Sequence, residues 1–254
     1  MKPFIGIIKP VQAPACRVFN AVIFMTLSLL PGEYAWAGFF SVTPVRVYMT
    51  PRDRAVAVTV SNEGDTEVVL QADLNTWSQK QDGTDEQLPT EDLILSPPII
   101  KLAPKARQVV RLALLKPADA SRQLIYRMIL REVPEAVPSR DQSIQMPIAL
   151  ALSLPVFITP PAAKREISCR AVLSDANALS ASCTNAGSAY AQVREVLVMR
   201  DSQVLARFEG GTYILPGAQQ AMGVKGHRAI TSGPAQLRVS FDDGKAQLFD
   251  VVLP

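Results

Sequence analysis

Few residues of this chain have the types and spacing that catalysis requires. His227 is the only histidine, within the Gly-rich stretch VKGHRA at 224–229, and no nucleophile motif such as G-x-S-x-G lies near it. Because a catalytic base needs a nucleophile and an orienting group beside it, a solvated loop histidine is the favoured interpretation. The adjacent carboxylates Asp242 and Asp243 are explained by a hairpin turn, on which neighbouring side chains point apart. We therefore expect a protein that is not an enzyme and that binds no metal or cofactor.

Two arginines within apolar stretches are more informative. Arg46 lies in PVRVYM at 44–49 and Arg127 lies in LIYRMILREV at 124–133, each flanked by strand-forming residues that predict a place on a sheet. Such arginines commonly line the solvent face of a sheet, with their aliphatic stems packed along it. The alternative is an anion site, because a fixed guanidinium can grip both oxygens of a carboxylate.

Short β-rich runs separated by Gly, Pro, Asn and Asp cover nearly everything after residue 39. Seven strands can be counted in the first set, and they include 42–48, 55–61, 68–77, 108–114, 124–133 and 144–158. Those of the second set are 166–173, 179–185, 191–200, 203–208, 236–241 and 246–253. The stretch TPPAA at 159–163 separates the two sets, because its prolines end a strand and stiffen a linker. The pattern predicts an all-β protein with two β-sandwich domains.

The last strand of the first set has a row of large apolar side chains at every second residue. Period two places such a row on one face of a strand. The row consists of Ile144, Met146, Ile148, Leu150, Leu152 and Leu154. Pro147 and Pro155 interrupt it with residues that have no N–H, which favours an edge strand. An apolar edge promotes aggregation unless a partner covers it, so the row either binds a partner or fills the core of its own domain.

The N-terminal segment has the features of a secretory signal peptide. Basic residues precede an uncharged run at 18–30, and AWAG at 35–38 predicts cleavage after Ala37, which defines residues 1–37 as the signal. Pro31-Gly32 and Glu33 interrupt the run before it reaches the roughly 20 residues of a membrane-spanning helix. We therefore expect export without stable membrane insertion. The net charge of +3, with no polybasic tract, gives no indication of nucleic-acid binding.

Outside the predicted signal peptide the chain has only Cys169 and Cys183, on consecutive predicted strands. An even pair in an exported chain predicts a disulfide, and two cysteines are too few for a four-ligand zinc site. We expect this bridge to serve stability alone.

The mature sequence resembles the periplasmic pilus-assembly chaperones of the chaperone-usher class. Three motifs carry the resemblance: VRVYMTPRDRAVAVTVSN at 45–62, SPPIIKLAPKARQVVRL at 96–112, and LREVP at 130–134 followed by the alternating strand. The resemblance implies two Ig-like β-sandwich domains arranged as an L with an interdomain cleft. It places the first domain at 38–159, with a donor strand at 144–158, and the second at 160–254.

The resemblance also implies a function. Family members lend the alternating edge strand to pilin subunits that lack a strand, and then deliver the subunits to an outer-membrane usher. We therefore expect a periplasmic chaperone with pilin subunits and the usher as its partners. The alternative is a structural pilus or adhesin subunit with Ig-like domains, and a hydrolase is a third hypothesis that the residues do not support.

Some positions depart from the well-studied branch of this family. That branch grips the terminal carboxylate of the subunit with an arginine, matched by Arg46, and with a lysine, in whose place Pro155 stands. We expect Arg127 to supply the second positive charge, with Arg131 or Lys101 as alternatives. Uncharged Gln123 and Thr159 stand where that branch has an interdomain ion pair. The pair Tyr126-Arg127, the SLPVF ending at 153–157 and the disulfide expected in the second domain resemble a divergent branch related to spore-coat-U-type pilin systems.

Overall fold

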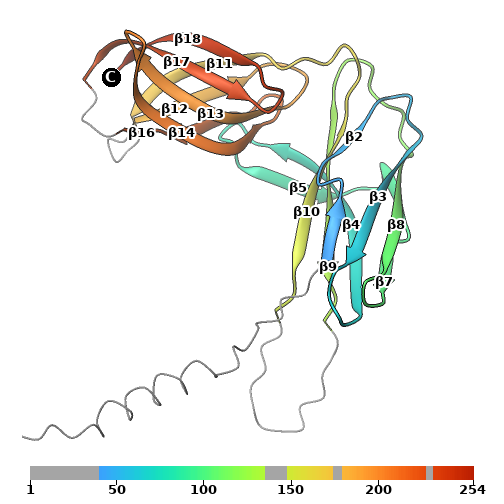
Figure 1. The fold of residues 1–254 in the computed structure, drawn as a ribbon. Coiled ribbons are helices and arrows are strands. Elements are labelled where there is room, and N and C mark those ends of the chain that lie inside the picture. Colours follow the sequence, from blue (N-terminus) through green and yellow to red (C-terminus); the bar gives the residue numbers. More distant parts are fainter. Residues whose placement is uncertain (1–39, 135–147, 174–178, 227–230) are drawn as a thin grey trace, which may run out of the picture. The chain divides into compact units, whose positions relative to one another are not determined.

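The computed structural model describes residues 40–134, 148–173, 179–226 and 231–254. Every helix or strand assigned in these ranges is a β-strand, and the strands form four sheets (Figure 1). The predicted signal peptide, Ile144, Met146 and His227 lie outside the described residues. Within the described ranges, no helix is long and apolar enough to cross a bilayer.

The first β-sandwich consists of two sheets that share one apolar core. The first sheet has the strand order β1 (Phe40–Thr43), β3 (Ala55–Asn62), β8 (Arg107–Leu114) and β6 (Leu93–Ser96). The second has the order β2 (Val47–Met49), β10 (Ala151–Ile158), β9 (Leu124–Glu132), β4 (Val68–Gln79) and β5 (Asp85–Pro89), and β7 (Ile99–Leu102) also pairs with β4. Alternate residues of these strands, such as Val58, Val60, Val110 and Leu112, are fully buried, as period two requires.

The predicted strand at 42–48 is two strands that belong to different sheets. β1 pairs with β3, whereas β2 pairs in parallel with β10, and a cis bond joins Thr43 to Pro44 between them. Proline has no N–H to continue a ladder, so the chain leaves one sheet there and enters the facing one. The prediction that Arg46 lies within a strand is wrong by one residue, because Arg46 precedes β2.

The sequence prediction missed three short strands of this sandwich, β5, β6 and β7. All five residues of β5 are exposed, so the alternation that would have revealed the strand is missing. β6 and β7 have four residues each and are separated by Pro97-Pro98. Strands this short are fixed by their pairing with β8 and β4 rather than by their own pattern.

The second β-sandwich has its own sheets and its own core. One sheet has the order β11 (Ile167–Leu173), β12 (Leu179–Asn185) and β15 (Gln219–Gly223). The other has the order β16 (Lys225–Gly226), β14 (Gln203–Ile214), β13 (Ala191–Arg200), β17 (Gly233–Phe241) and β18 (Ala246–Leu253). β12, β13 and β18 have the predicted bounds, β14 runs six residues further than predicted, and β15 and β16 were missed. The two-sandwich prediction is confirmed.

The hairpin between β17 and β18 and the disulfide both lie where the sequence predicts them. Gly244 has a φ of 77°, and its N–H donates to the Phe241 carbonyl at 3.1 Å, which closes the turn. Cys169 and Cys183 face each other across β11 and β12 and are joined by a disulfide.

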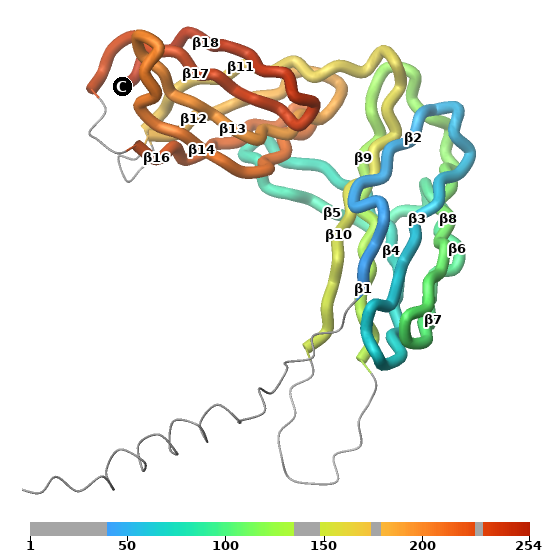
Figure 2. Tube along the Cα trace, in the orientation of Figure 1, coloured from blue at the N-terminus to red at the C-terminus, as the bar shows by residue number. Residues whose placement is uncertain are grey.

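The hairpin between β4 and β5 reaches the second sandwich, as the tube trace shows (Figure 2). The Gln81 carbonyl accepts a hydrogen bond from the N–H of Gln219 on β15 at 3.1 Å. The Gly83 carbonyl accepts from Nε2 of Gln220 at 2.7 Å. Gly83 has a φ of 84°, and a Cβ there would lie 2.6 Å from the Gln219 carbonyl oxygen. Only glycine meets both the turn and this close approach.

The disulfide gives the first testable prediction. Replacing both Cys169 and Cys183 by serine should lower the free energy of unfolding by about 3 kcal/mol, because the short loop closed by the bridge no longer restricts the unfolded chain. Thermal unfolding followed by circular dichroism measures the change. Binding of any partner by the first sandwich should be retained at moderate temperature. An unchanged melting temperature in the double variant would contradict the prediction.

Candidate functional site

β10 has a different neighbour on each side, and only one neighbour follows it throughout. β9 pairs with the whole strand from Ala151 to Ile158. On the other side, β2 pairs only with Val156, Phe157 and Ile158. Among the described residues, no strand pairs with the outer side of 151–155. The prediction of an edge strand therefore holds for the first part of β10, and is wrong for its last three residues.

The apolar row that leads into β10 is accessible at its start and buried in the core at its end. Ile148 is 86% exposed, and Leu150 and Leu152 are 37% and 38% exposed. Leu154 is only 4% exposed and belongs to the core of the first sandwich, together with Val156 and Ile158. Both readings of the row thus apply to different parts of it: its inner residues fill the protein's own core, and its outer described residues remain accessible.

Arg46 and Arg127 lie around one aromatic ring of the second sandwich. The guanidinium carbons of Arg46 and Arg127 are 6.0 Å and 5.8 Å from the ring centroid of Tyr213 on β14. Arg127 is also the register partner of Pro155 on the neighbouring strand. The guanidinium of Arg127 therefore lies on the strand next to Pro155, which stands in place of the expected lysine. The alternatives lie elsewhere: Lys101 pairs with Glu67, and Arg131 pairs with Asp73 and faces Ala151 at the far end of β10.

Arg46 belongs to a hydrogen-bonded chain that joins the two sandwiches. Its Nη1 lies 3.1 Å from Oδ2 of Asp242, and the hydroxyl of Tyr190 donates to the same oxygen at 3.0 Å. The hydroxyls of Tyr48 and Tyr190 are 3.0 Å apart, and Tyr48 is the donor because Tyr190 gives its hydrogen to Asp242. Burial and then the hydrogen bond with Tyr48 raise the pKa of Tyr190, so its hydroxyl stays protonated. The Tyr48 hydroxyl is also the main cause that raises the pKa of Arg46.

Arg127 has a different environment. Its guanidinium carbon lies 3.6 Å from the ring centroid of Trp77, which is a close cation–π contact. Its Nη1 reaches the Ser153 carbonyl only at 3.5 Å, and its buried Nε has no hydrogen-bond partner among the described residues. Burial lowers the pKa of the Arg127 guanidinium, and the charge of Asp85 partly opposes this effect. Arg127 is thus a half-buried cation without a carboxylate partner in the described structure.

A group of aromatic and apolar residues between the two cores, here called the junction cluster, positions both arginines. It comprises Trp77, Ile125, Phe157, Tyr190, Tyr213 and Leu215. Phe157 stacks on Tyr190 with ring centroids 4.0 Å apart, and Trp77 meets Tyr213 edge to face at 5.1 Å. The sequence analysis missed this cluster and treated Asp242 as a turn residue only. One signal was present, because the small-residue row of the last predicted strand ends in the large ring of Phe157.

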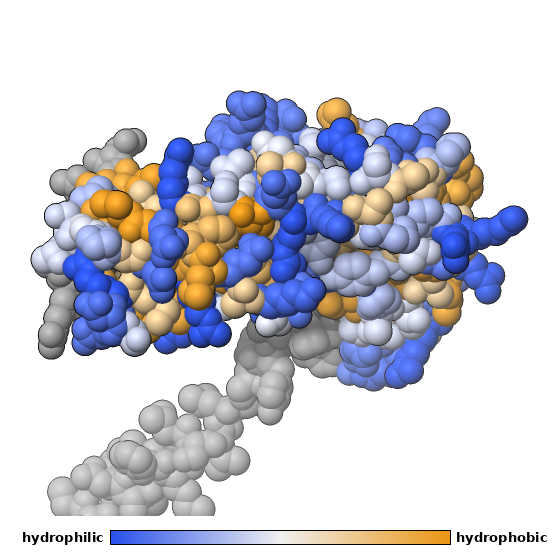
Figure 3. Space-filling model, turned by 90° about the horizontal axis from the view of Figure 1, so that it is seen from above, coloured by the Kyte–Doolittle hydropathy of each residue, from blue (hydrophilic) through white to orange (hydrophobic). Residues whose placement is uncertain are grey.

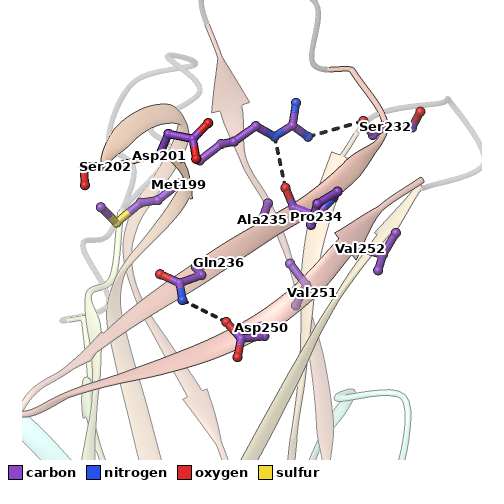
Figure 4. Close-up of a pocket in the computed structure, with 11 residues that line it drawn as sticks. Met199, Asp201, Ser202, Ser232, Pro234, Ala235, Gln236, Asp250, Val251 and Val252 are labelled. Carbon is purple, nitrogen blue, oxygen red and sulfur yellow. Dashed lines mark hydrogen bonds between the residues drawn. The ribbon is translucent and has the colours of Figure 1, made fainter.

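One hollow lies away from the two arginines, on the second sandwich. A hollow of about 880 Å³ at the β13–β14 turn of the second sandwich is lined by residues whose polar groups bond to one another (Figure 4). The Arg200 guanidinium donates to the Pro234 carbonyl at 3.0 Å, and Gln236 donates to Asp250 at 2.8 Å. On the face that Figure 3 shows, hydrophilic side chains lie between the apolar ones. Scattered exposure of this kind is ordinary for a protein surface.

Comparison with known proteins places this arrangement in a family. Residues 39–164 match the family described as "Pili and flagellar-assembly chaperone, PapD N-terminal domain". The chain belongs to this family. It is 21% identical over 146 residues to the probable fimbrial chaperone LpfB of Escherichia coli O157:H7, a match that covers 57% of this chain and 60% of that protein.

Solved structures with the same fold include members of chaperone-usher systems. A chain of the CsuC–CsuE chaperone–tip adhesion subunit pre-assembly complex, from the archaic chaperone-usher Csu pili of Acinetobacter baumannii, superposes with a TM-score of 0.60 and 18% identity, covering 84% of this chain and 98% of that one. The E. coli chaperone DraB superposes with a TM-score of 0.57 and 16% identity, covering 85% of this chain and 97% of that one. At these identities the likeness shows the two-domain Ig-like fold.

In this member of the chaperone family, uncharged side chains join the sandwiches where the sequence analysis noted a missing ion pair. Gln123 is 8% exposed, and its Nε2 donates to Oγ1 of Thr159 at 2.6 Å. Its Oε1 accepts from the N–H of Tyr190 at 2.9 Å, and its own N–H donates to the Ser188 carbonyl at 3.0 Å. One buried amide therefore connects the linker end of the first sandwich to Tyr190, which directly precedes β13.

This connection gives the second prediction. Gln123→Ala should lower the free energy of unfolding by about 1–3 kcal/mol, because the N–H of Tyr190 loses its acceptor in a buried place. Gln71→Ala is the control, since the amide of that exposed residue reaches only Asp73. Denaturant titration of both variants measures the difference. Equal stability of Gln123→Ala and Gln71→Ala would show that the connection contributes nothing.

Proposed function

We propose that the protein is a pilus-assembly chaperone that captures pilin subunits by donor-strand complementation and delivers them to an outer-membrane usher. The observation that carries this proposal is the open side of β10, with the accessible residues Ile148, Leu150 and Leu152 beside it. An incoming strand can complete the ladder along 151–155, while these side chains enter a groove of the subunit. Related structures include a chaperone–tip adhesion subunit complex and a chaperone–pilin complex, which supports the same mode of binding here.

Ile144 and Met146 belong to the proposed donor strand as its continuation beyond the described residues. Leu154 belongs to it by sequence, but its side chain is already committed to the core of the first sandwich. We infer that Leu154 anchors the donor strand to the protein, and that the row from Ile148 outward inserts. The proposal thus assigns two tasks to one face of one strand.

The two arginines around Tyr213 are proposed to bind the terminal carboxylate of the subunit. A slide of two residues leaves the same apolar face presented, so side-chain alternation alone fixes the register of an added strand poorly. A charge that binds the terminal carboxylate fixes the register. Arg127, the register partner of Pro155, is placed to bind the end of the added strand. Arginine suits the task, because its planar fork stays protonated and can meet both oxygens.

The proposal places the protein in the periplasm, with residues 1–37 as its signal peptide, and assigns it no catalytic activity. Among the described residues, no group of three or more His, Cys, Asp or Glu side chains could hold a metal ion. Esterase or peptidase activity of the purified protein, lost on a single side-chain change, would overturn this part of the proposal.

The third prediction compares two positions of the same row. Leu150→Asp should leave the free protein folded, because this side chain is 37% exposed, but should abolish recovery of the co-expressed pilin from periplasm. A buried leucine contributes about 1.5–3 kcal/mol, and an aspartate in the groove would bury an unpaired charge. Leu154→Asp should instead unfold the first sandwich, which circular dichroism detects. Loss of fold in Leu150→Asp would show that its side chain supports the protein's own core.

The fourth prediction concerns the carboxylate anchor. Arg46→Ala and Arg127→Ala should each reduce recovery of co-expressed pilin more than tenfold, because truncating one partner of a buried charge pair costs about 2–5 kcal/mol. Arg107→Ala is the matched control, since Arg107 is exposed on β8 and away from Tyr213. Circular dichroism should show all three variants folded. Full pilin recovery by both anchor variants would refute the anchor.

A further inference from the structure

The two arginines of the proposed anchor differ in what already holds them. Arg46 has a carboxylate on its guanidinium, that of Asp242 at 3.1 Å, whereas Arg127 has aromatic rings and one long contact with a carbonyl oxygen. The Arg46–Asp242 pair is largely enclosed, with side-chain exposures of 28% for Arg46 and 14% for Asp242. An incoming carboxylate therefore meets one cation, Arg127, that feels the charge of Asp85 but has no ion pair among the described residues, and one, Arg46, that is already paired.

We infer that Asp242 competes with the terminal carboxylate of the subunit for Arg46. Until a subunit binds, the carboxylate of Asp242 occupies the guanidinium of Arg46. This inference rests on the proposed function. Arg127 receives the terminal carboxylate first, and Arg46 then exchanges its ion pair with Asp242 for one with the subunit. Asp242 is a positioning residue in this scheme, because it acts through Arg46 and not on the subunit itself.

Electrostatics favours competition over simple addition of a second carboxylate. A subunit carboxylate beside Asp242 would place two negative charges on one guanidinium, where surrounding rings reduce screening by water. Either Asp242 then moves away from Arg46, or the two carboxylates repel each other. In both cases the charge of Asp242 weakens carboxylate binding, so neutralising it should strengthen that binding.

If the ion pair with Arg46 breaks, Asp242 still accepts a hydrogen bond from another residue. The Tyr190 hydroxyl donates to the same Oδ2 and lies on the second sandwich, as Asp242 does. Of the bonds that Asp242 makes with the described residues, only the one to Arg46 crosses to the first sandwich, so it is the bond that an exchange would break. The neighbouring Asp243 takes no part in these hydrogen bonds. Its carboxylate accepts from Nη1 and Nη2 of Arg165 at 2.9 Å and 3.2 Å. These adjacent aspartates therefore form a natural pair of test and control.

The experiment measures binding of one synthetic peptide in two forms. The peptide alternates valine and threonine, has solubilising lysines at its N-terminus, and ends in either a free carboxylate or a carboxamide. Titration calorimetry with the full chain gives the ratio of the two affinities for the wild type, Asp242→Asn and Asp243→Asn. Asparagine keeps the size of the side chain and an oxygen that accepts from Tyr190, and removes only the charge.

We expect the wild type to prefer the carboxylate form, and Asp242→Asn to bind that form about fivefold more tightly than the wild type does, as for one partly enclosed ion pair. Affinity for the carboxamide form should be the same in both proteins. Asp243→Asn should behave as the wild type.

Three outcomes would overturn the inference, and they separate it from the proposed function. If the wild type prefers the carboxylate but Asp242→Asn binds it equally or more weakly, Asp242 is no competitor and the anchor stands. If Asp243→Asn increases the affinity for the carboxylate peptide as much as Asp242→Asn does, the effect comes from the net charge of the protein. In that case again only the inference fails. If the wild type binds neither peptide, or both equally, the proposed strand capture or its anchor fails, and the inference falls with it.

Discussion

The period of a β-strand is the constraint on which the rest of this structure depends. Because successive side chains alternate between faces, a strand that extends beyond its core keeps pointing the same row in the same direction. β10 does this: Val156 and Ile158 are fully buried, and the same row becomes accessible at Leu152 and continues through Leu150 to Ile148, which precede the strand. The strand is held firmly at one end and presents an ordered apolar row at the other.

The opposite face of β10 builds the junction with the second sandwich. Phe157 lies on that face, fully buried between the rings of Tyr48 and Tyr190, and brings the two sandwiches together. The arginines lie against this aromatic cluster, where burial and rings reduce their contact with water. One strand thus links the accessible row, the junction and the cations.

In the proposed anchor, a departure from a family pattern is compensated in space. A proline in place of an expected lysine removes a charge from β10, but the register partner of Pro155 is Arg127 on β9. The charge is therefore offered from the neighbouring strand. The uncharged pair of Gln123 and Thr159 gives a second example, because their hydrogen bond and the acceptor that Gln123 offers to Tyr190 connect the sandwiches without ions.

The sequence by itself determined the all-β class, the two sandwiches, the disulfide partners, the closing hairpin and the alternating row, because each depends on local spacing or on residues that pair nearby. It also singled out Arg46 and Arg127 as candidates, since a charge within an apolar stretch is visible without coordinates. Only the tertiary structure decided that both arginines meet at Tyr213, that Asp242 holds one of them, and that the row divides between core and surface at Leu152 and Leu154. These contacts join residues far apart in the chain, and side-chain period assigns a residue to a face without saying what covers that face.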